Sequence, residues 1–169
     1  MGKQHAARNA DALCDEVYVQ VMGYMDKNRW LIELSESPRA RFWKVHNSEL
    51  SEPEQVFVSV WGLEAEVNNG GFFQYYSNSA GDNSLLAPSK LRAIGANNMA
   101  RIVEEANAIF GSAGPPKNRE ERQRMLESLA PSATEQWGQL DKQFFEYPNN
   151  LTDRLYYYVQ AHRAEIKGL

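Results

Sequence analysis

Residues 66–82 read EVNNGGFFQYYSNSAGD, and this stretch organises the helices on either side of it. The Asn-Asn-Gly-Gly run at 68–71 tolerates the left-handed backbone conformation that closes a helix, so it predicts the end of the preceding helix. The aromatic run at 72–76 predicts one or two helical turns. Phe72 and either Tyr75 or Tyr76 would then lie on one side and plug the core. A polar loop is expected at 77–83.

The helix before this break has a clear predicted start. Ser51-Glu-Pro-Glu54 combines an N-cap serine, a proline in the first turn and a glutamate three residues after the serine, which together form a capping box. Apolar residues follow at helical spacing and predict its buried face. They are Val56, Val60, Leu63 and Val67.

Four further helices are expected after the break, each introduced by a proline or an asparagine. They are predicted at 88–110, from Pro88; at 119–129, capped by Asn118; from Pro131 onward; and at 151–166, after the break at 147–150. Helical periodicity also predicts a helix at 9–26, followed by a short one that Asn28 caps.

Strand-like alternation is essentially absent, and no repeat or composition shift marks a second domain. We therefore predict an all-α fold, a single domain over residues 1–169 containing about seven to eight helices.

Composition and the single cysteine point to a cytoplasmic protein. The apolar and charged fractions, 43% and 24%, are those of an ordinary globular chain. No run approaches the length needed to cross a bilayer, and the first residues lack the apolar segment of a signal peptide. Cys14 cannot form an internal disulfide, which favours a reducing compartment. On an apolar helix face, it is interpreted as a buried small side chain.

The distribution of charge is uneven. Between Lys44 and Lys90 the sequence contains no Lys or Arg, although the net charge of the chain is only −4. The acids in this interval form a candidate partner-binding patch: Glu49, Glu52, Glu54, Glu64, Glu66 and Asp82. They are either a solvated helix face or a negative surface that meets a basic partner. Direct nucleic-acid binding is disfavoured, because no basic stripe is present to neutralise phosphates.

The polar side chains of the break suggest a second hypothesis. A Gly-Gly turn lets backbone approach a ligand, and neighbouring amides and hydroxyls could then read its polar groups. The candidate pocket residues are Asn68, Asn69, Gln74 and Tyr75. In the alternative, structural interpretation, these asparagines satisfy loose backbone groups at the helix end, and Asp82 caps the following segment.

No catalytic, metal-binding or cofactor-binding motif is recognised. His5, His46 and His162 are scattered, with no pair at metal-ligand spacing. Four basic residues, Lys117, Arg119, Arg122 and Arg124, alternate with glutamates. They are interpreted as a salt-bridged exposed helix face.

The motif at 66–82, with Asn-Gly-Gly-Phe, Gln-Tyr-Tyr and Asn-Ser-Ala-Gly-Asp, resembles the signature of a bacterial domain family that includes DNA-mimic proteins. Similar stretches recur at Leu91-Arg-Ala-Ile-Gly-Ala, Leu140-Asp-Lys-Gln-Phe-Phe and the closing Leu-Tyr-Tyr-Tyr-Val, so the resemblance covers roughly 50–165. It implies an all-helical fold. For the mimics it implies an acidic surface that occupies the DNA-binding face of a helix-turn-helix transcription factor.

These observations favour a non-enzymatic protein-binding domain that contacts a basic or DNA-binding protein through its acidic interval. A dedicated, immunity-type inhibitor would present the same features. The alternative from a different class is a small-ligand-binding domain or an unrecognised enzyme with a polar pocket at Asn68–Tyr76. The sequence does not indicate the oligomeric state.

Overall fold

A computed structural model describes residues 23–37, 47–129 and 131–167. Cys14 and most of the helix predicted at 9–26 lie outside these ranges. Residues 23–36 form one continuous helix, so the prediction that Asn28 caps a separate helix is wrong. Core contacts stabilise this helix beyond Asn28. Leu31 and Leu34 are buried, and Trp30 packs edge-on against Tyr156 of the last helix.

Helix α2, Glu52–Ser77, follows a short 3-10 helix, η1 (Asn47–Glu49). The predicted capping box is present. The Ser51 hydroxyl accepts a hydrogen bond from the Glu54 amide, and the Glu54 carboxylate accepts one from the Ser51 amide at 2.8 Å. The predicted apolar face is buried in full: Val56, Val60, Leu63 and Val67.

The predicted break at 68–71 is a kink within α2. Gly70 and Gly71 have non-helical backbone angles, and the φ of Gly71 is +72°. The Phe72 amide, which the kink deprives of a helical acceptor, donates instead to Asp141 Oδ1 at 2.8 Å. A Cβ at Gly71 would lie only 2.5 Å from that carboxylate. The kink therefore requires glycine for both its backbone conformation and its close approach to Asp141.

After η2 (Ser79–Asn83), the chain forms two helices where the sequence predicted one. Helix α3 covers Ala87–Ala93 and helix α4 covers Asn97–Ala108. The single helix predicted at 88–110 is wrong because Gly95, with φ +72°, closes α3. The Gly95 and Ala96 amides donate back to carbonyls of α3, both at 2.8 Å, as at other glycine-terminated helices.

The remaining starts agree with the sequence. Helix α5 is Arg119–Ser128, α6 is Pro131–Phe145 and α7 is Leu151–Ala161, followed by η3 (Arg163–Glu165). The Asn118 side chain caps α5, and Asn150 caps α7 in the same way. The described ranges contain seven α-helices and no strand, which confirms the all-α prediction.

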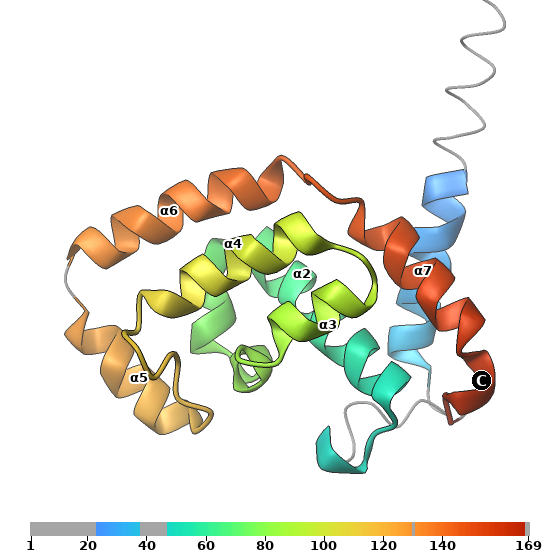
Figure 1. Cartoon of the computed structure of the whole chain (residues 1–169), viewed down its shortest axis with the longest axis horizontal. Helices are drawn as coiled ribbons and strands as arrows, with labels where there is room; N and C mark the ends of the chain where they lie inside the picture. Colours follow the sequence, from blue (N-terminus) through green and yellow to red (C-terminus); the bar gives the residue numbers. More distant parts are fainter. Residues whose placement is uncertain (1–22, 38–46, 130, 168–169) are drawn as a thin grey trace, which may run out of the picture.

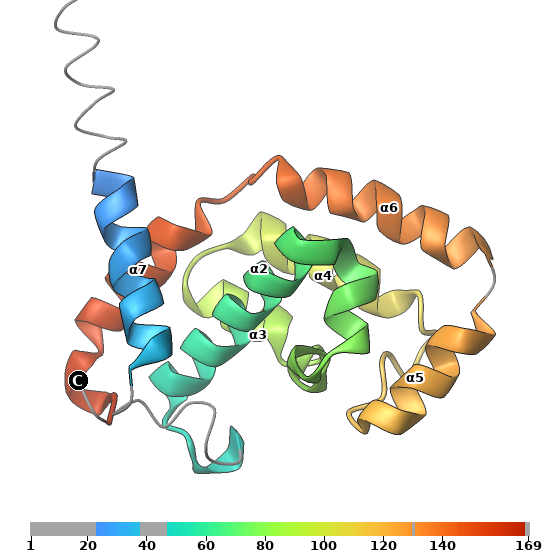
Figure 2. The same ribbon diagram turned by 180° about the vertical axis from the view of Figure 1, so that it is seen from behind.

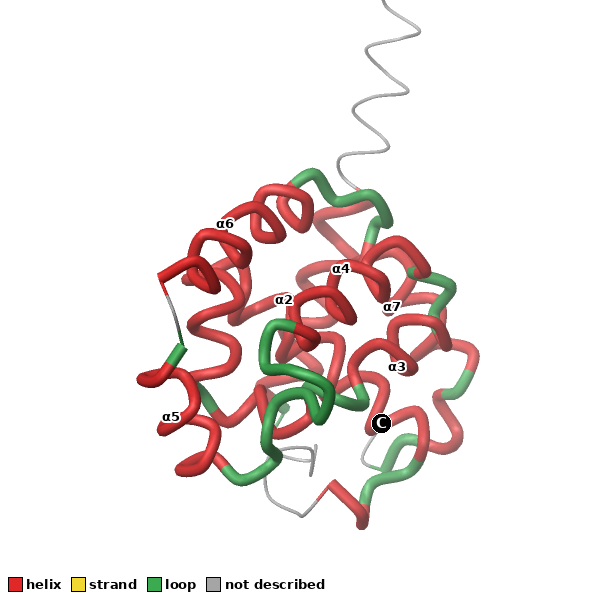
Figure 3. Tube along the Cα trace, turned by 60° about the vertical axis from the view of Figure 1, so that its left-hand side comes forward, coloured by secondary structure: helices red, strands yellow, loops and turns green. Residues whose placement is uncertain are grey.

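Helix α2 is the centre of the arrangement. It contacts α3, α5, α6, α7 and η2. Figures 1 and 2 show α6 running along α4 on one side of the molecule, with α5 at one end. Helix α7 and the helix 23–36 lie at the other end, near the C-terminus. The tube in Figure 3 shows that short loops connect most of these helices.

Three aromatic residues after the kink, Phe72, Tyr75 and Tyr76, are buried in the core as predicted, whereas Phe73 is half exposed. Phe72 and Tyr76 are fully buried and stack on each other. Phe72 meets Phe144 of α6, and Tyr76 meets Phe110 and Trp137 at centroid distances of 4.8 and 5.2 Å. The Tyr76 hydroxyl donates to Asn107 Oδ1 at 2.7 Å, so its polar end is satisfied inside the core.

Arg122 differs most from expectation. Predicted to lie on an exposed face, it is completely buried. Its guanidinium makes five hydrogen bonds: to the carbonyls of Tyr76 (2.7 Å), Asn78 (3.0 Å), Pro116 (2.7 Å) and Lys117 (3.0 Å), and to Asp82 Oδ1 (2.7 Å). Arg122 therefore ties the end of α2, η2 and the loop before α5 together. The other three basic residues of this cluster are exposed: Lys117, Arg119 and Arg124.

Replacing Arg122 by Met should lower the free energy of unfolding by about 3 to 5 kcal/mol, because four carbonyls and the Asp82 carboxylate lose their shared donor. Arg124→Met is the matched control on the same helix and should change stability by less than about 0.5 kcal/mol. Denaturant unfolding followed by circular dichroism measures both. Equal effects of the two substitutions would contradict a structural role for the buried guanidinium.

Candidate functional site

The six acids of the candidate patch do not share one surface. Glu54 is fully buried. Besides the Ser51 amide, its carboxylate accepts a hydrogen bond from the Lys167 amide at 3.0 Å, which holds the C-terminal segment against the start of α2. Glu54 is therefore a structural residue, and the prediction that it belongs to a partner-binding surface is wrong.

Glu66 and Asp82 also have partners inside the molecule. The Glu66 carboxylate accepts hydrogen bonds from Gln74 at 2.8 Å and Asn78 at 2.9 Å, which bridges the two halves of α2. Asp82 is the ion-pair partner of Arg122, and it does not cap the following segment as expected. Glu66 thus stabilises the region around the kink, and Asp82 stabilises the end of α2 through Arg122.

Only Glu49 and Glu52 of the six are well exposed. The Glu52 side chain is 64% exposed and pairs with Lys90 Nζ at 2.8 Å, whereas the Lys90 side chain is 8% exposed. Lys90 comes from α3. The interval without bases in the sequence is therefore not without bases in space, because folding brings a lysine back to its first helical turn.

The four candidate pocket residues do not line one pocket. Tyr75 is fully buried, and its hydroxyl has no hydrogen-bond partner among the described residues. Gln74 is bound to Glu66, and Asn69 is exposed. Asn68 lines a cleft, where its amide donates to the Tyr147 hydroxyl. The contacts of the described residues therefore do not bring these four side chains together in one polar pocket at Asn68–Tyr76.

The cleft that Asn68 lines has a volume of about 280 Å³ and is assembled from distant segments. Its lining combines aromatic, aliphatic and polar side chains: Tyr24, Asn28, Ile32, Trp61, Glu64, Ala65, Asn68, Tyr147 and Thr152. Within the sequence these residues lie in three groups, at 24–32, 61–68 and 147–152. No local motif could therefore have revealed the cleft.

Glu64 is the sixth acid of the patch and the charged group of this cleft. It is 8% exposed, and its Oε1 accepts a hydrogen bond from the Tyr147 hydroxyl at 3.1 Å. Burial raises the pKa of Glu64 to about 7, although the Tyr147 hydrogen bond acts in the opposite direction. Because it is buried, Glu64 does not belong to an exposed acidic patch.

Tyr147 is held in place by several contacts. It follows α6 with a positive φ of 47°, which non-glycine residues seldom adopt. Its amide donates to the Phe144 carbonyl at 3.0 Å, and its ring packs edge-on against Phe144. Unusual backbone conformations of this kind persist where surrounding contacts impose them. Here they direct the hydroxyl between Asn68 and Glu64.

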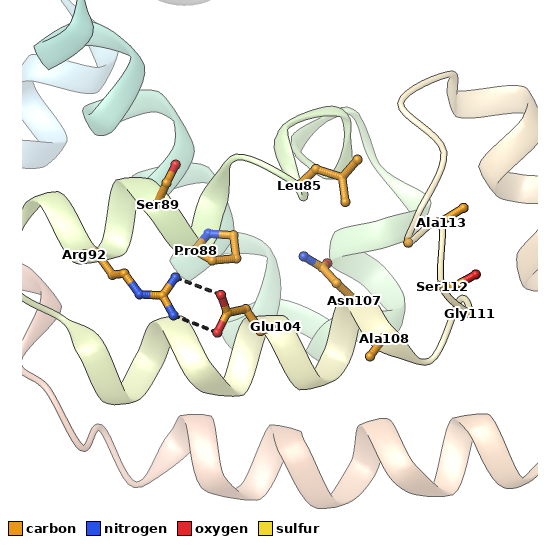
Figure 4. Close-up of a pocket in the computed structure, with 11 residues that line it drawn as sticks. Leu85, Pro88, Ser89, Arg92, Glu104, Asn107, Ala108, Gly111, Ser112 and Ala113 are labelled. Atoms are coloured by element: carbon orange, nitrogen blue, oxygen red, sulfur yellow. Dashed lines mark hydrogen bonds and ion pairs between the residues drawn. The ribbon is translucent and has the colours of Figure 1, made fainter.

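A second, more open cleft of about 450 Å³ lies between α3, α4 and the loop at 111–114 (Figure 4). Arg92 and Glu104 face each other across it with two hydrogen bonds of 2.8 and 2.7 Å. The pairing lowers the pKa of Glu104 and raises that of Arg92. Both charges already have a partner, so this cleft offers no free ionic group.

Neither a metal-binding cluster nor a membrane-spanning helix is found in the part of the chain that the structure describes. No group of three or more His, Cys, Asp or Glu side chains there could hold a metal ion. No helix there combines the length and apolar character that crossing a bilayer demands.

The pH dependence of stability should reveal Glu64. With a pKa of about 7 the folded chain keeps this proton where the unfolded chain, with a value of 4.5, has lost it. The free energy of unfolding therefore decreases as the pH rises from 4.5 to 7. Glu64→Gln cannot ionise and retains an acceptor for Tyr147. Above this range it should be more stable than wild type by roughly 2 to 3 kcal/mol, with no gain at the acid end.

Denaturant unfolding at about pH 5 and about pH 8 measures the difference. Glu105→Gln, at an exposed position of α4, is the control and should leave the pH dependence unchanged. If Glu64→Gln follows the wild-type pH curve, the carboxyl ionises normally in the folded state.

Comparison with known proteins agrees with the motif at 66–82. A family model described as DMP19-like protein matches residues 48–162, more than half of the chain, from η1 to the end of α7. The match confirms the resemblance to the DNA-mimic family. No curated protein and no solved structure matches significantly. The chain belongs to the DMP19-like protein family.

Proposed function

We propose that this protein is a non-enzymatic, cytoplasmic protein-binding domain that contacts a basic or DNA-binding protein, such as a helix-turn-helix transcription factor, by imitating DNA. The single observation that carries this proposal is the family match over residues 48–162. DNA mimicry has a simple physical basis, because carboxylates spaced like phosphates attract the Lys and Arg rows that bind a duplex.

The surface that suits such a contact is smaller than the acidic interval of the sequence. Glu54 and Glu64 are buried, Glu66 binds Gln74 across the kink, and Asp82 binds Arg122. Glu49 and Glu52 remain exposed at the start of α2.

A third carboxylate, Glu165 of η3, is exposed and lies 2.8 Å from His162 Nδ1. Its segment is held against the start of α2, because the Lys167 amide donates to Glu54. Glu52 and Glu165 both act on Tyr158, whose pKa is raised mainly by burial and further by these two charges. The carboxylates of Glu49, Glu52 and Glu165 are therefore the proposed contact, and we call them the α2-end acidic surface.

Charge reversal tests this contact. The double variant Glu49→Lys/Glu52→Lys should slow association with a co-purified DNA-binding partner by about tenfold, because electrostatic steering raises association rates 10- to 1,000-fold. Glu105→Lys, which changes an exposed charge on α4, should have little effect. Stopped-flow kinetics measures the rates.

Salt and DNA provide the second part of this test. Wild-type association should slow steeply between about 0.05 and about 0.5 M salt, because the Debye length shortens. A duplex carrying the partner's binding site should compete with the protein. An association rate that is insensitive to salt and to both lysine substitutions would overturn the α2-end acidic surface. Simultaneous binding of duplex and protein would overturn DNA mimicry.

A further inference from the structure

The cleft at Glu64 combines a buried carboxyl group with aromatic walls. Trp61 and Glu64 come from α2, Tyr147 from the turn after α6, and Tyr24 from the helix 23–36. The Trp61 ring is fixed by stacking on Phe57, with centroids 5.9 Å apart and planes 11° from parallel. Rings held in this way present fixed π faces, which attract cations.

Glu64 has no cationic partner among the described residues. Its one hydrogen bond within these ranges comes from the Tyr147 hydroxyl, and no Lys or Arg there forms an ion pair with it. The helix 23–36, which lines one side of the cleft, carries Lys27. This lysine is bound to Asp153 at 2.8 Å and lies over the Tyr157 ring. A buried carboxylate without a counter-ion is costly, so a bound cation would stabilise its ionised form.

We propose that this cleft is a binding site for an alkylammonium group, with Glu64 as its counter-ion and Trp61 and Tyr147 as its aromatic walls. The volume of about 280 Å³ is at the small end for ligand pockets, which suits an aliphatic amine or a single lysine side chain. An anion would face the Glu64 carboxylate and the negative faces of the rings, so the chemistry of the lining selects a cation.

Binding is linked to one proton. Near neutral pH a fraction of Glu64 carries its proton, because burial raises its pKa to about 7. An ammonium ion binds the carboxylate form, so this fraction releases its proton to solvent when the ligand binds. Among the described residues, the other titratable groups that line the cleft are Tyr24 and Tyr147. Burial raises the pKa of the Tyr147 hydroxyl, which therefore stays neutral.

This site does not depend on the proposed function. Glu64 lies twelve residues beyond Glu52 on α2, about 18 Å along the helix axis at 1.5 Å per residue. The α2-end acidic surface and the ammonium cleft can therefore succeed or fail separately in experiments.

Butylammonium is the first probe, titrated into the full chain at about pH 8 and followed by amide and indole NMR signals. Saturable shifts are expected at residues of the cleft, including the Trp61 indole. The neutral analogue butanol should bind at least about tenfold more weakly, since it lacks the charge. Glu64→Gln should weaken butylammonium binding by a similar factor, whereas Glu105→Gln should leave it unchanged.

The source of the ammonium group is distinguished with a second probe, N-acetyl-lysine methylamide. Tighter binding of this compound than of butylammonium assigns the cleft to a lysine side chain of a protein. Tighter binding of butylammonium assigns it to a free amine. Absence of saturable binding by both probes overturns the proposal, as does binding that Glu64→Gln leaves unchanged. A Trp61→Leu variant adds a check that does not alter charge, and it should weaken both probes.

Discussion

The buried guanidinium of Arg122 is the interaction on which the rest of the fold depends. A charged group with no exposure is tolerated only when every donor has an acceptor, and Arg122 meets this condition with four carbonyls and Asp82. The arrangement also explains Gly81, because a Cβ there would lie 2.7 Å from the Tyr75 carbonyl and 3.0 Å from Arg122 Nε. One side chain thereby sets the path of the chain after α2.

The kink in α2 positions the second half of the molecule in a comparable way. Three residues of α6 and its following turn contact the kink in order. Asp141 accepts from the Phe72 amide, Phe144 packs on the Phe72 ring, and Tyr147 reaches Asn68 and Glu64. The cleft at Glu64 is thus a consequence of how α6 docks on the Gly70–Gly71 turn. Fold and candidate site share the same contacts.

Several carboxylates of the acidic interval stabilise the fold. Glu54 caps a helix, Glu66 bridges the kink and Asp82 neutralises Arg122. Acidic residues within one sequence interval therefore need not form an acidic surface, since helix geometry distributes them over the interior and several faces. A DNA-mimic contact in this chain would rely on the few carboxylates that remain exposed near the start of α2.

The sequence by itself determined the local features whose signals lie within a few residues. The capping box at Ser51, the asparagine cap at Asn118, the proline start at Pro131 and the turn at Gly70–Gly71 all follow from short-range backbone chemistry. The left-handed conformation of Gly95 ends α3, although apolar residues at helical spacing continue across it and favour one longer helix. Tertiary structure alone decided the rest. It buries Arg122 and pairs Lys90 with Glu52. It also assembles one cleft from Glu64, Asn68 and Tyr147, which lie far apart in the chain. Long-range contacts of this kind depend on how helices dock, and no spacing within one helix encodes them.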